Sequence, residues 1–240
     1  MQLNLRPANM SDENFPRYRY EPLDPTRRQI RLIRLLTEQA IAWQTTIDCE
    51  IFHADLDENP EYEALSYVWG SETRPYNIRV NGHSLGVTLN LFSALSHLRT
   101  AEPRVLWVDA ICINQESHSE RGQQVAIMRD IFAGASRTTI WLGEFDFLPV
   151  QGSKDFLGHL QRTYDDSFLR NLVSDQKSDK NNPEVRNMQR IQNSTWFSRI
   201  WVVQETACGR EHLLFVLEHR KSLGISLSGG LQGLTRKVLL

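Results

Sequence analysis

The residues that could do chemistry in this 240-residue chain belong to three apolar segments, each of which contains tryptophan. These segments cover residues 62–70, 106–115 and 199–205. Burying a tryptophan stabilises a core, whereas a carboxylate or amide beside that core costs free energy unless it is paired. The grouping therefore predicts a polar site on a rigid scaffold. The polar groups of the three segments include Ser66, Asp109, Asn114, Gln115 and Glu205.

Asp109 is the carboxylate that most needs a partner, because it interrupts an otherwise apolar run from Val105 to Ile113. A buried carboxylate has to be paired, and Arg121 or a backbone N–H is the candidate partner. Two interpretations stay open for Asp109, a structural polar lock and a ligand site. The tryptophans at positions 107, 141 and 196 are predicted to belong to the core.

Strands are predicted by alternation of apolar and polar residues in the first half of the chain. The sequence favours strands at 30–36, 47–51 and 63–68. The dipeptide Asn81-Gly82 separates two further strand-like runs, 76–80 and 84–88, which is the signature of a type I′ hairpin. The acidic run 55–59 is similar to the start of a calcium loop, but Pro60 and Ser66 stand where glycine and glutamate are needed, so no metal site is expected.

Helices are predicted by apolar residues at helical spacing. Asn90 is a candidate cap for a helix that places Leu91, Leu95 and Leu98 on one face. Residues 105–113 should follow as a central strand covered on both faces. The pattern Ser117-x-x-Glu120 is that of a capping box, and it precedes a single helix whose apolar stripe runs to Ala135.

The remaining elements complete the predicted architecture. We expect a strand at 138–142, a short helix at 155–164, and a helix capped by Asn193 or Ser194 in which Trp201 and Glu205 share one face. A strand, a helix and a strand in succession imply a right-handed crossover. The predicted fold class is therefore α/β, with an open, mostly parallel sheet flanked by helices and an inserted antiparallel β-hairpin.

Composition excludes several function classes. The chain has 27 Lys and Arg against 29 Asp and Glu, so its formal charge of −2 provides no general attraction for nucleic acid. The basic stretch 17–34 is interleaved with acidic and apolar residues and is predicted to be a solvated strand face. Three separated cysteines indicate a reducing compartment, and Cys49 and Cys112 are expected to be buried. With no apolar leader or spanning segment, the predicted location is cytoplasmic.

The three tryptophan-bearing segments together closely resemble the signature segments of the fungal heterokaryon incompatibility (HET) domain. The resemblance runs from about Tyr62 to Glu205 and includes Glu120 to Val125, Met128 and the run Ile140 to Glu144. It implies a role in self/non-self recognition that ends in programmed cell death after oligomerisation. The partners that it implies are further copies of the chain or another cell-death signalling protein.

A more distant resemblance links residues 198–205 to the Ser…Trp-Cys-x-x-Glu helix of TIR domains, and it implies a TIR-like, flavodoxin-like sheet. In enzymatic TIR domains this glutamate cleaves the nicotinamide–ribose bond, which implies NAD as a substrate rather than a cofactor and Glu205 as the catalytic residue. A carboxylate near the ribose can stabilise an oxocarbenium-like state. Val202 and the hairpin depart from the TIR pattern. The full set of candidate binding residues is Ser66, Trp69, Asp109, Asn114, Gln115, Arg121 and Trp201.

Two alternatives accompany this interpretation. Glu205 could instead pair with Arg199 or Arg121 on a helix surface. The domain could also be a non-enzymatic, self-associating adaptor, like the TIR domains of adaptor proteins.

The expected domain organisation has four parts. Residues 1–26 are predicted to be a disordered leader and residues 27–60 to be strands that pack on the main domain. The HET-like domain is predicted at 61–210. The resemblance dissolves in residues 211–240, which suggests a truncated or misread tail.

Overall fold

The computed structural model describes residues 15–37, 46–145, 182–199, 205, 208, 212–218 and 221–227. The chain forms two compact units. The first comprises residues 1–65 and 69–136, and the second comprises residues 66–68 and 137–240. The helix predicted at 155–164 and Trp201 lie outside the described residues.

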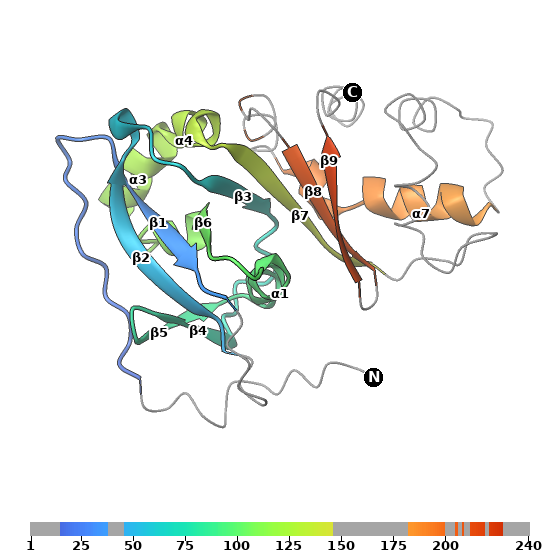
Figure 1. The fold of residues 1–240 in the computed structure, drawn as a ribbon, viewed down its shortest axis with the longest axis horizontal. Helices are drawn as coiled ribbons and strands as arrows, with labels where there is room; N and C mark the ends of the chain where they lie inside the picture. The colour runs from blue at the N-terminus through green and yellow to red at the C-terminus, as the bar shows by residue number, and fades with distance from the viewer. Residues whose placement is uncertain are drawn as a thin grey trace. The chain divides into compact units, whose positions relative to one another are not determined.

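The first unit contains strands in the order β5-β4-β2-β1-β6-β3. Their bounds are β1 (Gln29–Leu35), β2 (Asp48–Asp55), β3 (Glu63–Tyr67), β4 (Tyr76–Val80), β5 (His83–Val87) and β6 (Arg104–Trp107). The last two residues of β3, Ser66 and Tyr67, belong to the second unit. β1 lies antiparallel to both β2 and β6, whereas β2–β4 and β3–β6 are parallel pairs. Figure 1 shows β2 curving past β1, with the β4–β5 hairpin at its N-terminal end. The α/β class is confirmed, but the prediction of a mostly parallel sheet is wrong because the sheet is mixed.

The β4–β5 hairpin forms as its turn residues predict. Asn81 and Gly82 both have positive φ angles, 48° and 76°, as a type I′ turn requires. The amide of Asn81 also exchanges two hydrogen bonds with the backbone of Ile51 in β2, at 3.0 and 3.1 Å. One side chain therefore sets the turn and ties the hairpin to the neighbouring strand.

β1 has covered side chains on both faces rather than the predicted solvated face. Ile30, Leu32, Ile33 and Leu35 are all buried, and so is Arg31. The prediction of a solvated basic face is therefore wrong for Arg31, although Arg34 remains exposed. The charge on Arg31 is tolerated there because Glu120 pairs with it.

The predicted strand 105–113 is wrong in its second half. β6 ends at Trp107, and Asp109–Cys112 forms the short helix α2. The amide groups of Ile111 and Cys112 both donate to the carbonyl of Val108, at 2.9 and 2.7 Å. A carboxylate is favourable in the first turn of a helix, whereas it would be unpaired inside a strand covered on both faces.

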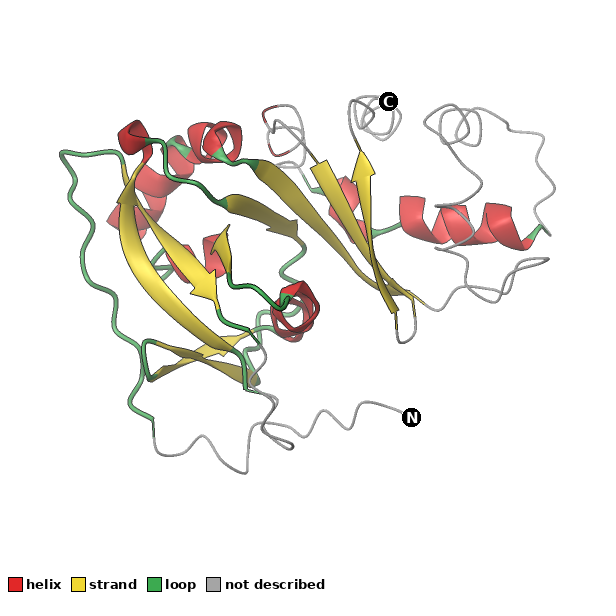
Figure 2. Ribbon diagram, in the orientation of Figure 1, coloured by secondary structure: helices red, strands yellow, loops and turns green. Residues whose placement is uncertain are grey.

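The helices of the first unit are short segments between the strands (Figure 2). In α1 (Leu89–Leu98) the predicted face Leu91, Leu95 and Leu98 is buried, but the cap is Thr88 and not Asn90. The hydroxyl of Thr88 lies directly before the helix and accepts from the amide of Leu91 at 3.3 Å.

The long helix predicted after Ser117 is also wrong, because two helices form in its place. They are α3 (His118–Ala126) and α4 (Met128–Gly134), and they meet at Ile127, whose ψ of 5° leaves the helical range. The buried Gln124 donates to the carbonyl of Gln29 at 3.0 Å, and the amide of Ile127 bonds within a tightened turn. Ser117 caps α3 as predicted, by accepting from the amide of Glu120.

The second unit contains β7 (Arg137–Phe145), β8 (His212–Glu218) and β9 (Lys221–Leu227). β7 and β8 are parallel, and β8 and β9 form an antiparallel hairpin. α7 (Pro183–Gln192) begins with a proline, which suits the first turn of a helix because its missing N–H has no partner there anyway. Ser194 then caps the 3-10 helix η2 (Thr195–Ser198).

The prediction of one continuous helix from Asn193 or Ser194 to Glu205 is wrong. Arg199 has extended backbone angles directly after η2, so the helical path is interrupted before Glu205. The tryptophans predicted to be core residues, Trp107 in the first unit and Trp141 and Trp196 in the second, are fully buried.

Candidate active site

Glu205 is buried, with 1% of its surface exposed, and it lies at the centre of a polar cluster in the second unit. The cluster comprises Ser66, Trp196, Arg199 and Glu205. We call it the Glu205 cluster. Burial of a carboxylate costs roughly several kcal/mol unless ion pairs and hydrogen bonds compensate for the lost hydration. The contacts of Glu205 provide both.

Arg199 binds the carboxylate of Glu205 with two nitrogens. Its Nη2 lies 2.9 Å from Oε1 and its Nη1 lies 3.2 Å from Oε2. The Arg199 side chain is 20% exposed, whereas that of Glu205 is 2% exposed. Such a two-point contact fixes the plane of the carboxylate as well as its charge. The interruption of the helix at Arg199 lets a residue only six positions away reach Glu205.

Ser66 links the carboxylate to a tryptophan. The indole Nε1 of Trp196 donates to the Ser66 hydroxyl at 2.7 Å, and that hydroxyl donates to Oε2 of Glu205. Ser66 is 1% exposed and lies in β3, while Trp196 lies in η2. Thr138 adds a contact at 3.4 Å from its hydroxyl to the main-chain oxygen of Glu205. Both carboxylate oxygens are therefore occupied.

The cluster holds an oriented carboxylate, and its surroundings determine what that group can do. An isolated carboxylate beside a sugar could stabilise positive charge, but here Arg199 already supplies the countercharge. A substrate would reach Oε1 only if Arg199 moved away. The alternative pairing of Glu205 with Arg199 is confirmed, though in a buried position and not on a helix surface.

A second group of predicted site residues gathers in the first unit. The indole Nε1 of Trp69 donates to Oδ2 of Asp109 at 2.9 Å, and Nε2 of Gln115 donates to the main-chain oxygen of Asp109, also at 2.9 Å. Oδ1 of Asp109 accepts from the amide of Ala110 at 2.7 Å. The prediction that a backbone N–H would partner Asp109 is confirmed. Trp69 is 37% exposed, so this group lies at the surface.

Asn114 and Arg121 have other contacts. The amide of Asn114 donates to Oε1 of Glu120 at 2.7 Å, and the side-chain oxygen of Asn114 accepts from the amide of Glu116 at 3.2 Å. Arg121 is exposed and lies 3.0 Å from Nδ1 of His118. The predicted alternative pairing of Arg121 with Asp109 does not form among the described residues, because Arg121 contacts His118 instead. The structure thus joins Ser66 with Glu205, and Trp69 with Asp109 and Gln115.

The residue that sequence reasoning missed is Arg31. Its Nη1 lies 2.6 Å from Oε1 of Glu120 and 3.0 Å from the carbonyl of Cys112, and its Nη2 lies 2.5 Å from the carbonyl of Glu21. Burial works to raise the pKa of Glu120, but the hydrogen bonds from Arg31 and from the Asn114 amide outweigh it and lower that pKa. The signal was present in the sequence, because Arg31 falls inside the apolar run 30–35 where a charge demands a partner.

The described part of the chain contains neither a metal-binding cluster nor a membrane-spanning helix. Among these residues no group of three or more His, Cys, Asp or Glu side chains is placed to hold a metal ion. No helix within the same residues has the length and apolar character needed to cross a bilayer.

The sequence of the chain is similar to those of known proteins. The family described as heterokaryon incompatibility protein (HET) matches residues 62–205. The chain is also 39% identical over 134 residues to heterokaryon incompatibility protein 6, OR allele, of Neurospora crassa. That match covers 50% of this chain and 19% of the relative, so the chain spans about a fifth of the relative's length. No solved structure matches.

Proposed function

The chain belongs to the heterokaryon incompatibility (HET) family, and we propose that it acts in fungal self/non-self recognition as a domain that promotes programmed cell death. The family match over residues 62–205 carries this proposal. The name of the Neurospora crassa relative points the same way. All three tryptophan-bearing segments fall within or at the end of the matched range.

At the molecular level we propose a signalling module whose Glu205 cluster is a structural lock. The observation that supports this is the enclosure of Glu205, whose oxygens are taken by Ser66 and Arg199 at 1% exposure. Within the second unit the cluster joins Ser66 to Trp196, Arg199 and Glu205 through polar contacts that are costly to break singly. Assembly with further copies, or with another cell-death protein, would then transmit the signal.

NAD cleavage through Glu205 is the second candidate. This candidate is supported by the contacts from Arg199 and from the Ser66 hydroxyl, because they hold the carboxylate of Glu205 in a single orientation. Such preorganisation is what a catalytic carboxylate requires. This candidate needs Arg199 to release Oε1 when the protein assembles, so that a ribose can approach.

The two candidates are separated by neutralising Glu205 alone and then together with its partner. Glu205→Gln leaves Arg199 without its countercharge, so a lower melting temperature is expected under both. The double variant Arg199→Met with Glu205→Gln removes the whole ion pair and should recover much of that loss, because no unpaired charge remains. Each protein is tested for cell death in a fungal host, and for nicotinamide release from NAD when fused to an oligomerising scaffold.

The double variant decides between them. If the lock is structural, recovery of stability restores cell death, and no nicotinamide release depends on Glu205. If Glu205 is catalytic, the double variant stays inactive however stable it is, while the wild type releases nicotinamide. Arg186→Met, which neutralises an exposed arginine of α7, is the matched control and should behave as wild type in both assays.

A further inference from the structure

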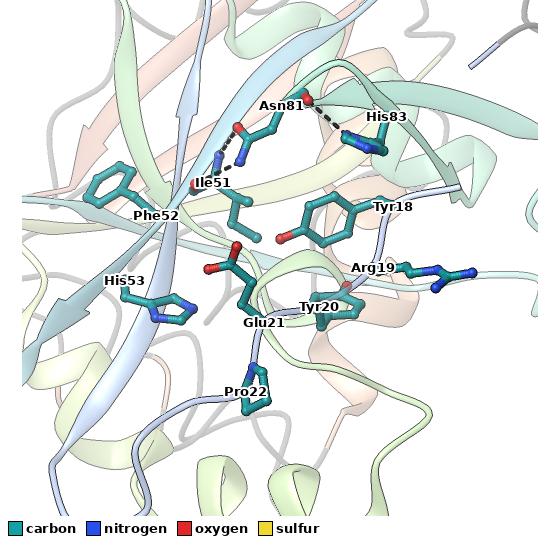
Figure 3. A pocket seen from close by; sticks show the side chains of 10 residues that line it. All are labelled: Tyr18, Arg19, Tyr20, Glu21, Pro22, Ile51, Phe52, His53, Asn81 and His83. Atoms are coloured by element: carbon teal, nitrogen blue, oxygen red, sulfur yellow. Dashed lines mark hydrogen bonds between the residues drawn. The ribbon is translucent and has the colours of Figure 1, made fainter. Parts of the chain in front are cut away.

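A pocket of about 510 Å³ lies in the first unit, away from the residues predicted to form the site. Figure 3 shows that its wall comes from the segment Tyr18–Pro22, from β2 around His53, and from the turn that carries Asn81 and His83. The hydroxyl end of Tyr18 and the ring of His53 lie beside the carboxylate of Glu21, whereas the ring of His83 lies on the far side of Tyr18 (Figure 3).

The wall formed by residues 18–22 is held in place by several contacts. The amide of Tyr18 donates to the carbonyl of Ser84, and the amide of Ser84 donates to the carbonyl of Pro16, both at 2.9 Å. The hydroxyl of Tyr20 donates to the carbonyl of Ile111 at 2.9 Å. The guanidinium of Arg31 lies 4.9 Å from the centre of the Tyr20 ring. The pocket is therefore preformed, which lowers the entropic cost of binding.

Glu21 supplies a negative charge that its neighbours do not neutralise. Within the described ranges its carboxylate makes no hydrogen bond and no ion pair, and its main-chain oxygen is the atom that Arg31 binds. Figure 3 shows the Arg19 side chain directed away from that carboxylate. The charge of Arg31 is already balanced by Glu120.

The other polar groups of the wall include two imidazole rings and the side-chain amide of Asn81. Nδ1 of His83 lies 2.9 Å from the carbonyl of Asn81, which can only accept, so Nδ1 is the donor in this contact. The amide of Asn81 is occupied by Ile51. Burial, together with the charge of Arg31, lowers the pKa of His53, so its ring is uncharged at neutral pH.

We propose that this pocket binds an alkylammonium group, from either a lysine side chain or a free polyamine. The ammonium would donate hydrogen bonds to the carboxylate of Glu21 and would lie beside the ring of Tyr18. A carboxylate without an ion pair, next to aromatic rings, matches a cation in charge and as a hydrogen-bond acceptor. This site is independent of the role proposed for Glu205.

Calorimetric titration of the 240-residue chain tests the proposal with three probes. They are spermidine, an acetylated and amidated Ala-Ala-Lys-Ala-Ala peptide, and the same peptide with norleucine in place of lysine. Glu21→Gln removes the charge from an exposed residue and should weaken binding roughly 10- to 100-fold, as expected for a charge-assisted hydrogen bond. Glu21→Asp keeps the charge and should retain part of the affinity.

Glu72→Gln is the matched control, because Glu72 is exposed and is not among the residues that line the pocket. Binding of spermidine alone would identify a free polyamine as the ligand, and binding of the lysine peptide but not the norleucine peptide would identify a protein side chain. The proposal is overturned if neither amine saturates the chain at about 10 mM. Equal affinities of the wild type and of folded Glu21→Gln would overturn it as well.

Discussion

The guanidinium of Arg31 and the carboxylate of Glu120 form a part-buried ion pair, with Nη1 and Oε1 2.6 Å apart. Their side chains are 1% and 12% exposed. Arg31 lies in β1 and Glu120 in α3, and Arg31 also binds the carbonyls of Cys112 and Glu21. The guanidinium of Arg31 therefore connects β1 with the C-terminal end of α2 and with the segment Tyr18–Pro22, which forms one wall of the pocket.

Loss of one partner of this pair should destabilise the chain strongly. We expect Arg31→Met to lower the free energy of unfolding by about 1–3 kcal/mol, because the part-buried carboxylate of Glu120 loses its countercharge. The double variant Arg31→Met with Glu120→Met should lose less unfolding free energy than the two single variants lose in total. The difference, which is the coupling energy of the pair, should be about 1–3 kcal/mol. Urea unfolding of the four proteins measures this coupling, and strict additivity would show that the pair contributes nothing as a pair.

The same pair predicts how stability depends on pH. The pKa of Glu120 is lower in the folded chain than its ordinary value of 4.5. A lowered folded pKa means that the contribution of Glu120 is complete above pH 4.5 and is lost as the pH falls through the folded value. Asp55, whose pKa is lowered by the amide of Asp57 and by Arg27, adds a dependence of the same sign.

Glu120→Gln isolates its share of that dependence. Thermal melts at a series of pH values should show a shallower decline of stability in acid for Glu120→Gln than for the wild type. Glu116→Gln is the control, because Glu116 is exposed, and it should keep the slope of the wild type. Parallel curves for wild type and Glu120→Gln would contradict the assignment.

Asp109 gives a test of structural lock against ligand site. Asp109→Ala removes the acceptors for the indole of Trp69 and the amide of Ala110, and should cost about 1–2 kcal/mol of unfolding free energy. Asp109→Asn keeps a side-chain oxygen and should cost less. Chemical denaturation gives both values. Loss of cell-death activity in Asp109→Asn at unchanged stability would instead assign Asp109 to a ligand.

The buried thiols should resist modification in the folded chain. Burial raises the pKa of both Cys49 and Cys112 to about 12, so each stays protonated at neutral pH. Cys208 is partly exposed. We expect a thiol reagent at pH 7.5 to label Cys208 first, and Cys49 and Cys112 only after denaturant is added, with mass spectrometry locating the labels. Cys208→Ser should abolish the fast phase, and rapid labelling of either buried thiol would contradict their placement.

Local chemistry explains why several elements were predictable from the sequence. The Asn81-Gly82 turn, the Ser117 cap and the apolar face of α1 depend on residues within one or two turns of each other. The burial of Trp107, Trp141 and Trp196 follows from side-chain hydrophobicity alone. Family membership likewise follows from the order and spacing of the tryptophan-bearing segments, which is a property of the chain and not of its fold.

Long-range contacts decided the rest. The strand predicted for 105–113 ends at Trp107, because Asp109 lies in the first turn of α2. The helix predicted to reach Glu205 is interrupted at Arg199. Hydrophobic periodicity does not tell a strand from the first turn of a helix when apolar residues continue through both. The sheet directions were missed because pairing joins strands far apart in sequence, as β1 with β6.

The sequence by itself determined the α/β class, the hairpin, the tryptophan core and the HET family, because each rests on local spacing or on residue type. Only the tertiary structure decided that Glu205 is enclosed by Ser66 and Arg199, that Arg31 pairs with Glu120, and that Glu21 faces a pocket. The physical reason is that the state of a charged group is set by its neighbours in space, through burial, countercharge and hydrogen bonds. Those neighbours lie up to 139 positions away along the chain.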